Sequence, residues 1–148
     1  MSWRAQAWRP SRKPPVREVA CPVALHLDGV PRRIAAFEHP LAGLQLVKGG
    51  IRPGERPEQA AARELFEESG LETRAAISLG DTTGIDAGTR WHFSLCRLAG
   101  PLRDRWQHLC ADDGGHLFRF FWLDLDAPLP KGFAPPFQRA FDWIRASL

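Results

Sequence analysis

GGIRPGERPEQAAARELFEESGL, residues 49–71, is the stretch from which the rest of the chain is interpreted. Two glycines lead into residues 57–69, whose composition predicts a helix. Within it Glu64, Glu67 and Glu68 stand at positions i, i+3 and i+4, so that a helix presents all three carboxylates on one face. Like charges at this spacing repel one another, whereas a hard divalent cation such as Mg2+ requires a cluster of carboxylate oxygens. The stretch therefore predicts a metal-binding helix.

The segments on both sides of this helix are predicted to be mostly strands. Runs rich in β-forming residues, separated by turn signals, predict strands over residues 19–27, 32–37, 41–47, 71–79, 89–98 and 116–125. Asp28-Gly29 predicts a hairpin turn between the first two. Residues 100–115, which include Trp106 and His108, are interpreted as a long polar connection.

The chain is predicted to close with an amphipathic helix over residues 137–148. Phe137, Phe141, Ile144 and Leu148 form one apolar stripe, and Trp143 lies off it, where it flanks the core or joins an interface. Strands on both sides of a central helix, with a second helix at the end, indicate a mixed α/β layered domain.

Composition narrows the class of protein. A chain of 148 residues with 44% hydrophobic and 25% charged residues is typical of one globular domain. No run of 18 apolar residues is present, so a membrane span is not expected, and the N-terminus lacks the apolar block of a secretory signal. Three widely spaced cysteines predict free thiols and a cytoplasmic location.

Residues 1–18 are interpreted as a basic N-terminal arm that precedes a domain over residues 19–148. The net charge of the whole chain is only +3, but the arm carries one acid, Glu18, against five cations: Arg4, Arg9, Arg12, Lys13 and Arg17. Such an arm either contacts nucleic acid or an anionic substrate, or is a solvated tail.

Residues 49–71 resemble the signature of the Nudix hydrolases. That signature runs Gly, five residues, Glu, seven residues, Arg-Glu, an aliphatic residue, any residue, Glu-Glu, any residue, Gly, and an aliphatic residue. Here it is filled by Gly49, Glu55, Arg63, Glu64, Leu65, Glu67, Glu68, Gly70 and Leu71, with no departure at a fixed position. The resemblance implies an α/β fold, specifically a Nudix-type α/β/α sandwich with a mixed sheet. It also implies Mg2+ or Mn2+ dependence and hydrolysis of a nucleoside diphosphate linked to another group.

The resemblance also implies roles for individual residues of the signature. Glu67 and Glu68 correspond to direct metal ligands, and Glu64 to a further ligand or the general base. Glu55 and the backbone carbonyl of Gly49 correspond to contributors to the metal site. Glu55 has an alternative interpretation as a helix cap or an ion-pair partner. The resemblance further implies that Arg63 orients the glutamates.

The general base and the substrate contacts are less defined by the sequence. Asp112 and Asp113 are candidates for a base from a later loop, although Asp-Asp-Gly-Gly is also strong turn chemistry. His116 is interpreted as a structural strand residue. The substrate-binding candidates are Lys48, Arg33 and His39, with Arg90 as a further cation and Trp91, Phe118 or Trp122 as base-stacking side chains or core residues.

Two functional hypotheses follow from these observations. The first is an Mg2+-dependent Nudix pyrophosphohydrolase acting on a nucleotide or a dinucleoside polyphosphate-like substrate. The second is a Nudix-fold module that binds a nucleotide or RNA without turnover. The complete glutamate set favours the first, because a binding module has no need of mutually repelling carboxylates. A nucleotide-type small molecule is the expected partner, RNA is a further candidate, and a homodimer is a possible assembly. The specific substrate stays open.

Overall fold

The computed structural model describes residues 15–27, 29–111 and 114–148. Most of the predicted arm, Asp28 of the predicted hairpin turn, and the candidate bases Asp112 and Asp113 lie outside these ranges. The elements in chain order are β1 (Arg17–Leu25), β2 (Arg33–His39), β3 (Gly43–Gln45), β4 (Gly49–Gly50), α1 (Pro57–Ser69), β5 (Thr73–Thr82), β6 (Thr89–Leu98), β7 (Trp106–Cys110), β8 (His116–Asp124) and α2 (Pro135–Ser147).

The strands form one sheet in the order β5-β6-β1-β2-β8-β7, with β3 paired to β2 and β4 paired to β1. β1 runs parallel to β6 along its whole length, and the other pairings are antiparallel. The sheet is therefore mixed, as predicted. Strand β1 lies at its centre, and the buried residues that follow Glu18 explain this position, because a central strand is covered on both faces.

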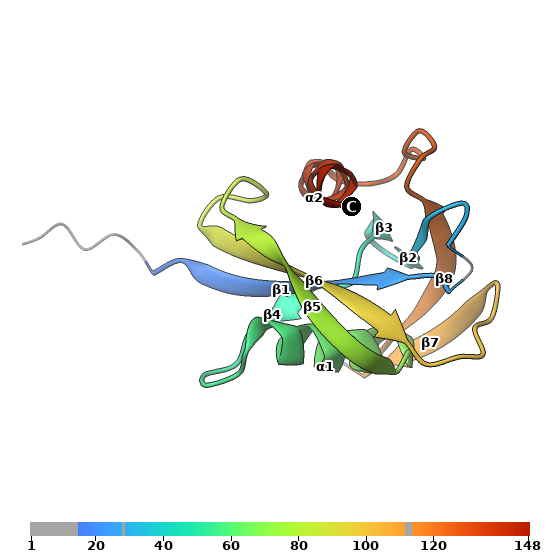
Figure 1. Ribbon diagram of the computed structural model, residues 1–148, viewed down its shortest axis with the longest axis horizontal. Helices are drawn as coiled ribbons and strands as arrows, with labels where there is room; N and C mark the ends of the chain where they lie inside the picture. Colours follow the sequence, from blue (N-terminus) through green and yellow to red (C-terminus); the bar gives the residue numbers. More distant parts are fainter. Residues whose placement is uncertain (1–14, 28, 112–113) are drawn as a thin grey trace, which may run out of the picture.

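Alternation along β1 separates two hydrophobic cores. Val19, Cys21 and Val23 contribute to the core on one face, whereas Ala20 and Ala24 contribute to the core on the other. Successive strand side chains point to opposite faces, so one strand serves both layers. Helix α2 covers the first face and α1 the second, which gives the predicted α/β/α sandwich (Figure 1).

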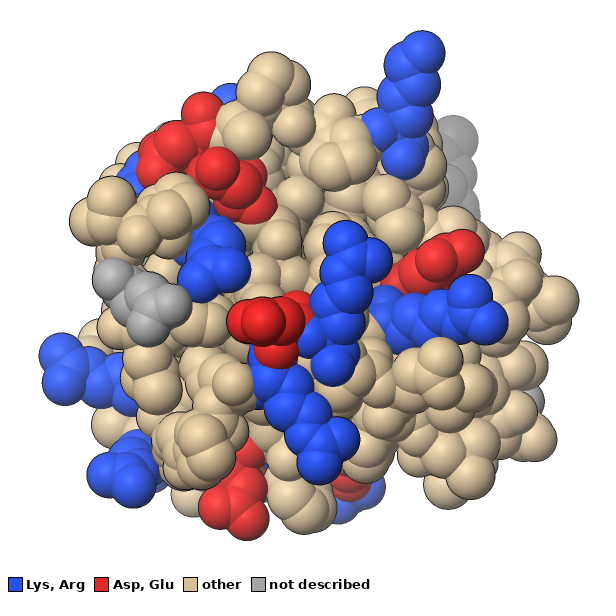
Figure 2. All heavy atoms as spheres, turned by 90° about the vertical axis from the view of Figure 1, so that its right-hand side faces the viewer, with Lys and Arg blue, Asp and Glu red and all other residues tan. Residues whose placement is uncertain are grey.

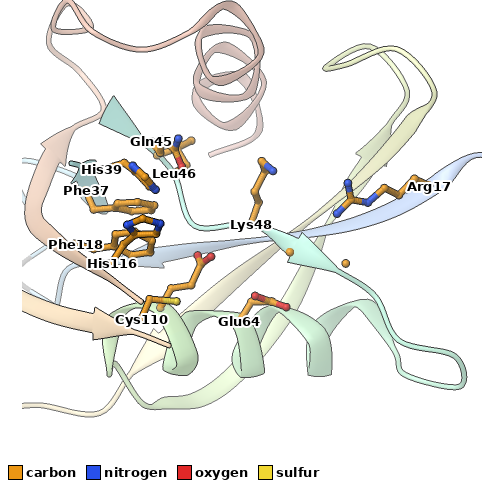
Figure 3. A pocket seen from close by; sticks show the side chains of 13 residues that line it. Arg17, Phe37, His39, Gln45, Leu46, Lys48, Glu64, Cys110, His116 and Phe118 are labelled. Carbon is orange, nitrogen blue, oxygen red and sulfur yellow. The ribbon is translucent and has the colours of Figure 1, made fainter. Parts of the chain in front are cut away.

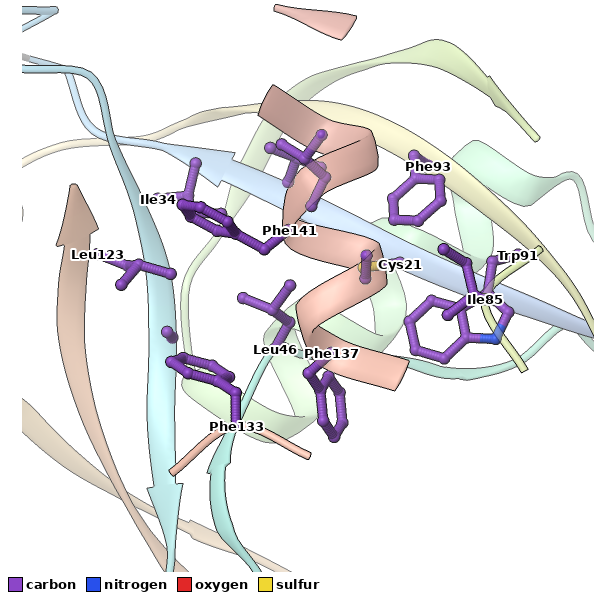
Figure 4. Close-up of a cluster of buried hydrophobic side chains, with 14 of the residues drawn as sticks. Cys21, Ile34, Leu46, Ile85, Trp91, Phe93, Leu123, Phe133, Phe137 and Phe141 are labelled. Carbon is purple, nitrogen blue, oxygen red and sulfur yellow. The ribbon is translucent and has the colours of Figure 1, made fainter. Parts of the chain in front are cut away.

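The closing helix packs as its apolar stripe predicts. Phe137, Phe141 and Ile144 are buried against the first core, as Figure 4 shows for the two phenylalanines. Trp143 flanks this core by stacking on Phe93, with ring centroids 4.3 Å apart and planes 15° apart. Neither of the two helices in the described ranges has the length and the apolar run that a membrane span requires.

The predicted long polar connection over residues 100–115 is wrong in its centre, because strand β7 lies there. Trp106 and His108 face inward and are half-buried, while Gln107 and Leu109 are exposed. Trp106 stacks on Phe120 at a centroid distance of 5.0 Å and donates an indole hydrogen bond to the Ser69 carbonyl at 2.9 Å. The strand is an edge strand, and contacts with β8 and α1 that are distant in sequence hold it in place.

The first strand begins two residues before the predicted domain boundary. Arg17 and Glu18, the last two residues of the predicted arm, pair with Thr89 and Arg90 of β6. The division into an arm and a domain stays a prediction, with its boundary falling inside β1.

Candidate metal and substrate site

A cavity of about 500 Å3 lies between helix α1 and the sheet and brings together the predicted site residues Lys48, His39, Gly49, Glu64 and Glu68. It is lined by Arg17, Phe37, His39, Gln45, Leu46, Lys48, Gly49, Gly50, Glu64, Glu68, Cys110, His116 and Phe118 (Figure 3). These residues come from β1, β2, β3, β4, α1, β7 and β8 or from the segments between them. The cavity is therefore formed by α1 and one part of the sheet, and β5 and β6 do not line it.

A close approach in the cavity joins Gly49 to Glu64. Gly49 lies in β4, held against Ala20 of the central strand, and Glu64 is a largely buried residue of α1. A Cβ atom added to Gly49 would lie 2.0 Å from the Glu64 carboxyl carbon and 2.3 Å from both carboxylate oxygens. Any side chain at position 49 would thus displace the carboxylate, so glycine is required for the helix carboxylate and the strand backbone to meet.

Arg63 connects the loop before α1 to the carboxylates on it. Its Nε and Nη2 atoms donate to the two oxygens of Glu55, each at 2.8 Å. Its Nη1 atom donates to Glu64 at 2.6 Å and to Glu67 at 3.4 Å. The Gly50 carbonyl accepts a further bond from Nη2 at 3.0 Å. Arg63 therefore joins the three glutamates in one hydrogen-bonded network, for which a planar fork suits the bidentate geometry better than a lysine would. Its role in orienting them for metal binding stays a prediction.

Glu55 forms a strong ion pair with Arg63, and the pKa values of both groups reflect it. The hydrogen bonds from Arg63, and secondarily one from the Arg52 backbone N–H at 3.1 Å, lower the pKa of Glu55 to about 2. The same carboxylate raises the pKa of Arg63 above its ordinary value. Glu55 does not line the cavity and forms an ion pair with Arg63, and its contribution to a metal site stays a prediction.

The oxygen donors of the cavity fit a hard divalent cation. Glu64, Glu68 and the backbone of Gly49 line it together, and the required absence of a Cβ at Gly49 keeps the backbone accessible. Glu67 is more exposed, 37% for its side chain, and pairs with Arg52 at 3.7 Å. Among the described residues no three His, Cys, Asp or Glu side chains converge as a complete ligand set. Mg2+ completes such partial sets with water and phosphate oxygens.

Cations line the cavity beside these carboxylates. Lys48 extends over the ring of Trp91, with Nζ 5.8 Å from the ring centroid, and Arg17 enters from the start of β1 (Figure 3). Lys48 and His39 thus both line the cavity, and their binding of substrate stays a prediction. Trp91 itself is buried in the core, so it supports Lys48 and is not available to stack a base.

Other predicted contacts lie elsewhere. Arg33 stands at the opposite end of β2 from His39, with Nη2 3.4 Å from Nδ1 of His26, and does not line the cavity. Arg90 lies near Asp81 at 3.4 Å on another part of the sheet. Trp122 donates to the Arg103 carbonyl at 2.8 Å. Asp113 lies outside the described residues, so its role as a base stays a prediction.

Several cavity residues have no motif in the sequence that singles them out. Gln45, Phe37 and Cys110 reach the site only through tertiary packing. Arg17, predicted as one of the cations of the arm, lines the cavity as well. His116, predicted to be structural, also lines it. Its position beside the turn chemistry of residues 112–115 is a signal that it lies at the end of a strand, where site residues gather.

The chain belongs to the Nudix hydrolase family, because the family model described as the NUDIX domain matches residues 30–144. Solved structures share its fold. A MutT NUDIX hydrolase from Burkholderia pseudomallei is 20% identical with a TM-score of 0.61, covering 89% of this chain and 99% of that one. An ADP-ribose pyrophosphatase from Streptococcus suis is 15% identical with a TM-score of 0.64, covering 89% and 90%.

Curated relatives are similar over a shorter stretch. Proteins named RNA pyrophosphohydrolase from Yersinia enterocolitica and Yersinia pestis are 55% identical to this chain over 38 residues. The match spans 26% of this chain and 22% of the length of each relative.

Proposed function

We propose that this protein is an Mg2+- or Mn2+-dependent pyrophosphohydrolase that cleaves the diphosphate bond of a nucleoside diphosphate linked to another group. The observation that carries the proposal is the cavity that Glu64, Glu68 and the Gly49 backbone line together with Lys48 and Arg17. Carboxylates alone repel a diphosphate, so this combination has a use only when a cation lies between protein and substrate.

The position of each residue in or beside the cavity indicates its role in this proposed reaction. Glu64, Glu68 and the Gly49 carbonyl would hold a divalent ion, which supplies positive charge for the diphosphate and activates water for in-line attack. Arg63 keeps the carboxylates in orientation, and Lys48 donates to phosphate oxygens. The proton acceptor is either Glu64 or, from outside the described residues, Asp113.

RNA is a substrate candidate for this activity. The name of the Yersinia relatives, the cations of the arm and the entry of Arg17 into the cavity support it. Figure 2 shows basic side chains interspersed with acidic ones on one face of the molecule, so support for RNA comes from the arm and the cavity. The cytoplasmic location and the homodimer stay predictions.

A substrate panel tests the proposal. Nucleoside triphosphates, dinucleoside polyphosphates, ADP-ribose and 5′-triphosphorylated RNA are incubated with and without Mg2+ or Mn2+, and products are separated by chromatography. We expect metal-dependent cleavage of at least one member. If none is cleaved while calorimetry detects nucleotide or RNA binding, the module without turnover is the correct function.

Glu68→Gln provides the residue-level test of this proposal. It keeps the size of the side chain and removes its charge, and we expect turnover to fall at least about 100-fold, because several kcal/mol of electrostatic stabilisation depend on the cation. Glu58→Gln is the matched control: the same substitution in the first turn of α1, at a position that does not line the cavity. Near wild-type turnover by Glu68→Gln would contradict the metal assignment.

A further inference from the structure

The last turn of α1 carries two of the signature glutamates and ends against strand β7. Glu67 and Glu68 lie in this turn, and Glu68 lines the cavity. The last four carbonyl groups of a helix have no partner within the helix, so they bond to water, to a cap or to another part of the protein. In α1 the Phe66 carbonyl accepts the backbone N–H of Gly70 at 2.9 Å, which closes the helix. Two of the other carbonyls have partners in β7.

Trp106 and His108 of β7 donate side-chain hydrogen bonds to these two carbonyls. The indole Nε1 of Trp106 lies 2.9 Å from the Ser69 carbonyl oxygen, and Nε2 of His108 lies 3.1 Å from the carbonyl oxygen of Glu67. A carbonyl oxygen only accepts hydrogen bonds, so Nε2 of His108 carries a proton. The helix that bears the carboxylates is therefore joined at its C-terminal end to an edge strand of the sheet (Figure 1).

Packing holds both donors in place. Trp106 stacks almost flat on Phe120, a buried residue of β8, with the two ring planes 9° apart. The His108 ring packs against Gly70, where an added Cβ atom would lie 3.1 Å from Nδ1. Glycine at position 70 therefore has two uses, because it also adopts the positive φ of 76° that ends the helix.

The same face of β7 also reaches the cavity. Trp106, His108 and Cys110 alternate along the strand, so their side chains point to one face of the sheet, where α1 lies. Cys110 lines the cavity together with Glu68, and the two donors bond to the turn that carries Glu68. One strand thus forms part of the cavity wall and holds the end of the helix beside it.

We propose that Trp106 and His108 are positioning residues for the divalent-cation site. Their hydrogen bonds hold the last turn of α1 against β7 and thereby keep the Glu68 carboxylate at the cavity. The inference rests on the proposed function and deepens it, because it assigns the placement of the carboxylates to a strand outside residues 49–71. Neither side chain lines the cavity, so both act through the helix and not on substrate. Without these bonds the last turn opens more readily, and the site binds a cation more weakly.

Binding of Mn2+ alone tests the positioning role without turnover. Trp106→Phe and His108→Leu each remove one donor, and the double variant removes both. Mn2+ is titrated into the full chain, and the free ion is measured by electron paramagnetic resonance. We expect the Kd of the double variant to rise about tenfold, because two hydrogen bonds no longer hold the turn. Amide hydrogens of residues 67–70 are expected to exchange faster in the double variant without metal. Equal Mn2+ affinity in the wild type and the double variant would overturn the proposal.

Two further variants separate positioning from a general loss of stability. Trp122→Phe is the matched control, since it makes the same substitution and removes an indole bond of 2.8 Å to the carbonyl of Arg103, between β6 and β7. Its Mn2+ affinity is expected to stay within about twofold of the wild type. His108→Gln returns a side-chain donor and is expected to recover most of the affinity lost in His108→Leu. An equal loss in Trp122→Phe, or no recovery in a His108→Gln variant that melts like the wild type, would contradict the role of the hydrogen bonds.

Kinetics keep this inference apart from the proposed function. With the panel substrate that is cleaved fastest, the double variant should need about tenfold more Mg2+ for its half-maximal rate. At saturating Mg2+, kcat and the KM for substrate should stay within about threefold of the wild type. A loss of kcat that saturating Mg2+ does not correct would refute the positioning role. Absence of turnover with every substrate would refute the proposed function, and the Mn2+ affinities would still decide whether Trp106 and His108 position the site.

Discussion

At the scale of single residues, Gly49 and Glu64 show how closely backbone and carboxylate meet in the cavity. A methyl group at position 49 would lie 2.0 Å from the Glu64 carboxyl carbon, far below any van der Waals contact. Gly50, the next residue of the same strand, has nothing within 4 Å of the corresponding position. The two neighbouring glycines are therefore a matched pair that differs in what their side-chain positions face.

We expect Gly49→Ala to lower turnover about 100-fold or more, because the methyl group forces Glu64 away from the backbone of β4. Gly50→Ala is expected to cost far less. Metal-dependent turnover and Mg2+ affinity measure the effect, and thermal melting shows whether each variant is folded. Equal losses in the two variants would mean that the close approach at Gly49 has no special role.

At the scale of elements, α1 is tied to the loop before it by the Arg63–Glu55 pair. Both side chains are mostly buried, 17% and 16% exposed, and two bonds of 2.8 Å join them. The pair Arg32–Asp126 reaches 2.7 Å at its shortest, but its side chains are 35% and 53% exposed. The two ion pairs thus have similar distances and different solvation.

Arg63→Ala is expected to lower the free energy of unfolding by about 1–3 kcal/mol, because it leaves mostly buried carboxylates without their donors. Arg32→Ala is expected to lower it clearly less, since water screens an exposed pair. Urea denaturation of the two variants measures the difference. Similar costs would show that burial does not distinguish the pairs.

At the scale of the whole molecule, the three cysteines are distributed over both hydrophobic cores of the sandwich. Cys21 is buried in the core under α2, and Cys96 and Cys110 are buried in the core under α1. All three are free thiols, as the sequence predicts. Burial raises the pKa of Cys21 above its ordinary value and that of Cys96 to about 11.

These shifts predict a stability that falls in alkaline solution. Because the folded pKa of Cys96 is raised, the folded state retains its proton while the unfolded state releases it. The contribution is complete below about pH 8.5 and is lost as pH rises toward 11. The chain has no tyrosine, so few other groups titrate in this window. Urea denaturation between pH 7.5 and 10.5 should show a shallower decline for Cys96→Ser than for wild type; identical slopes would contradict the assignment.

Local sequence patterns were sufficient to predict those helices and strands that are stabilised mainly by contacts between residues near one another in the chain. The helix over Pro57–Ser69 and the strand over Thr89–Leu98 lie where the sequence predicts them, and Gly70 ends the helix with φ of 76°. Strand β7 was missed because its alternation is half polar, and its contacts with Phe120 and Ser69 come from distant segments. Arg33 and His39 were equal candidates in the sequence, yet a strand of seven residues places them at opposite ends.

The sequence by itself determined the family, the α/β/α sandwich and the carboxylate face of α1, because helical periodicity and a fixed spacing of glycines and glutamates are properties of the chain alone. Only the tertiary structure decided which carboxylates line the cavity, that Glu55 forms an ion pair with Arg63, and that the rings of His39 in β2 and His116 in β8 lie in contact. Those outcomes depend on pairing between distant segments, since each cavity residue reaches its place through the sheet order and the packing of α1 against it.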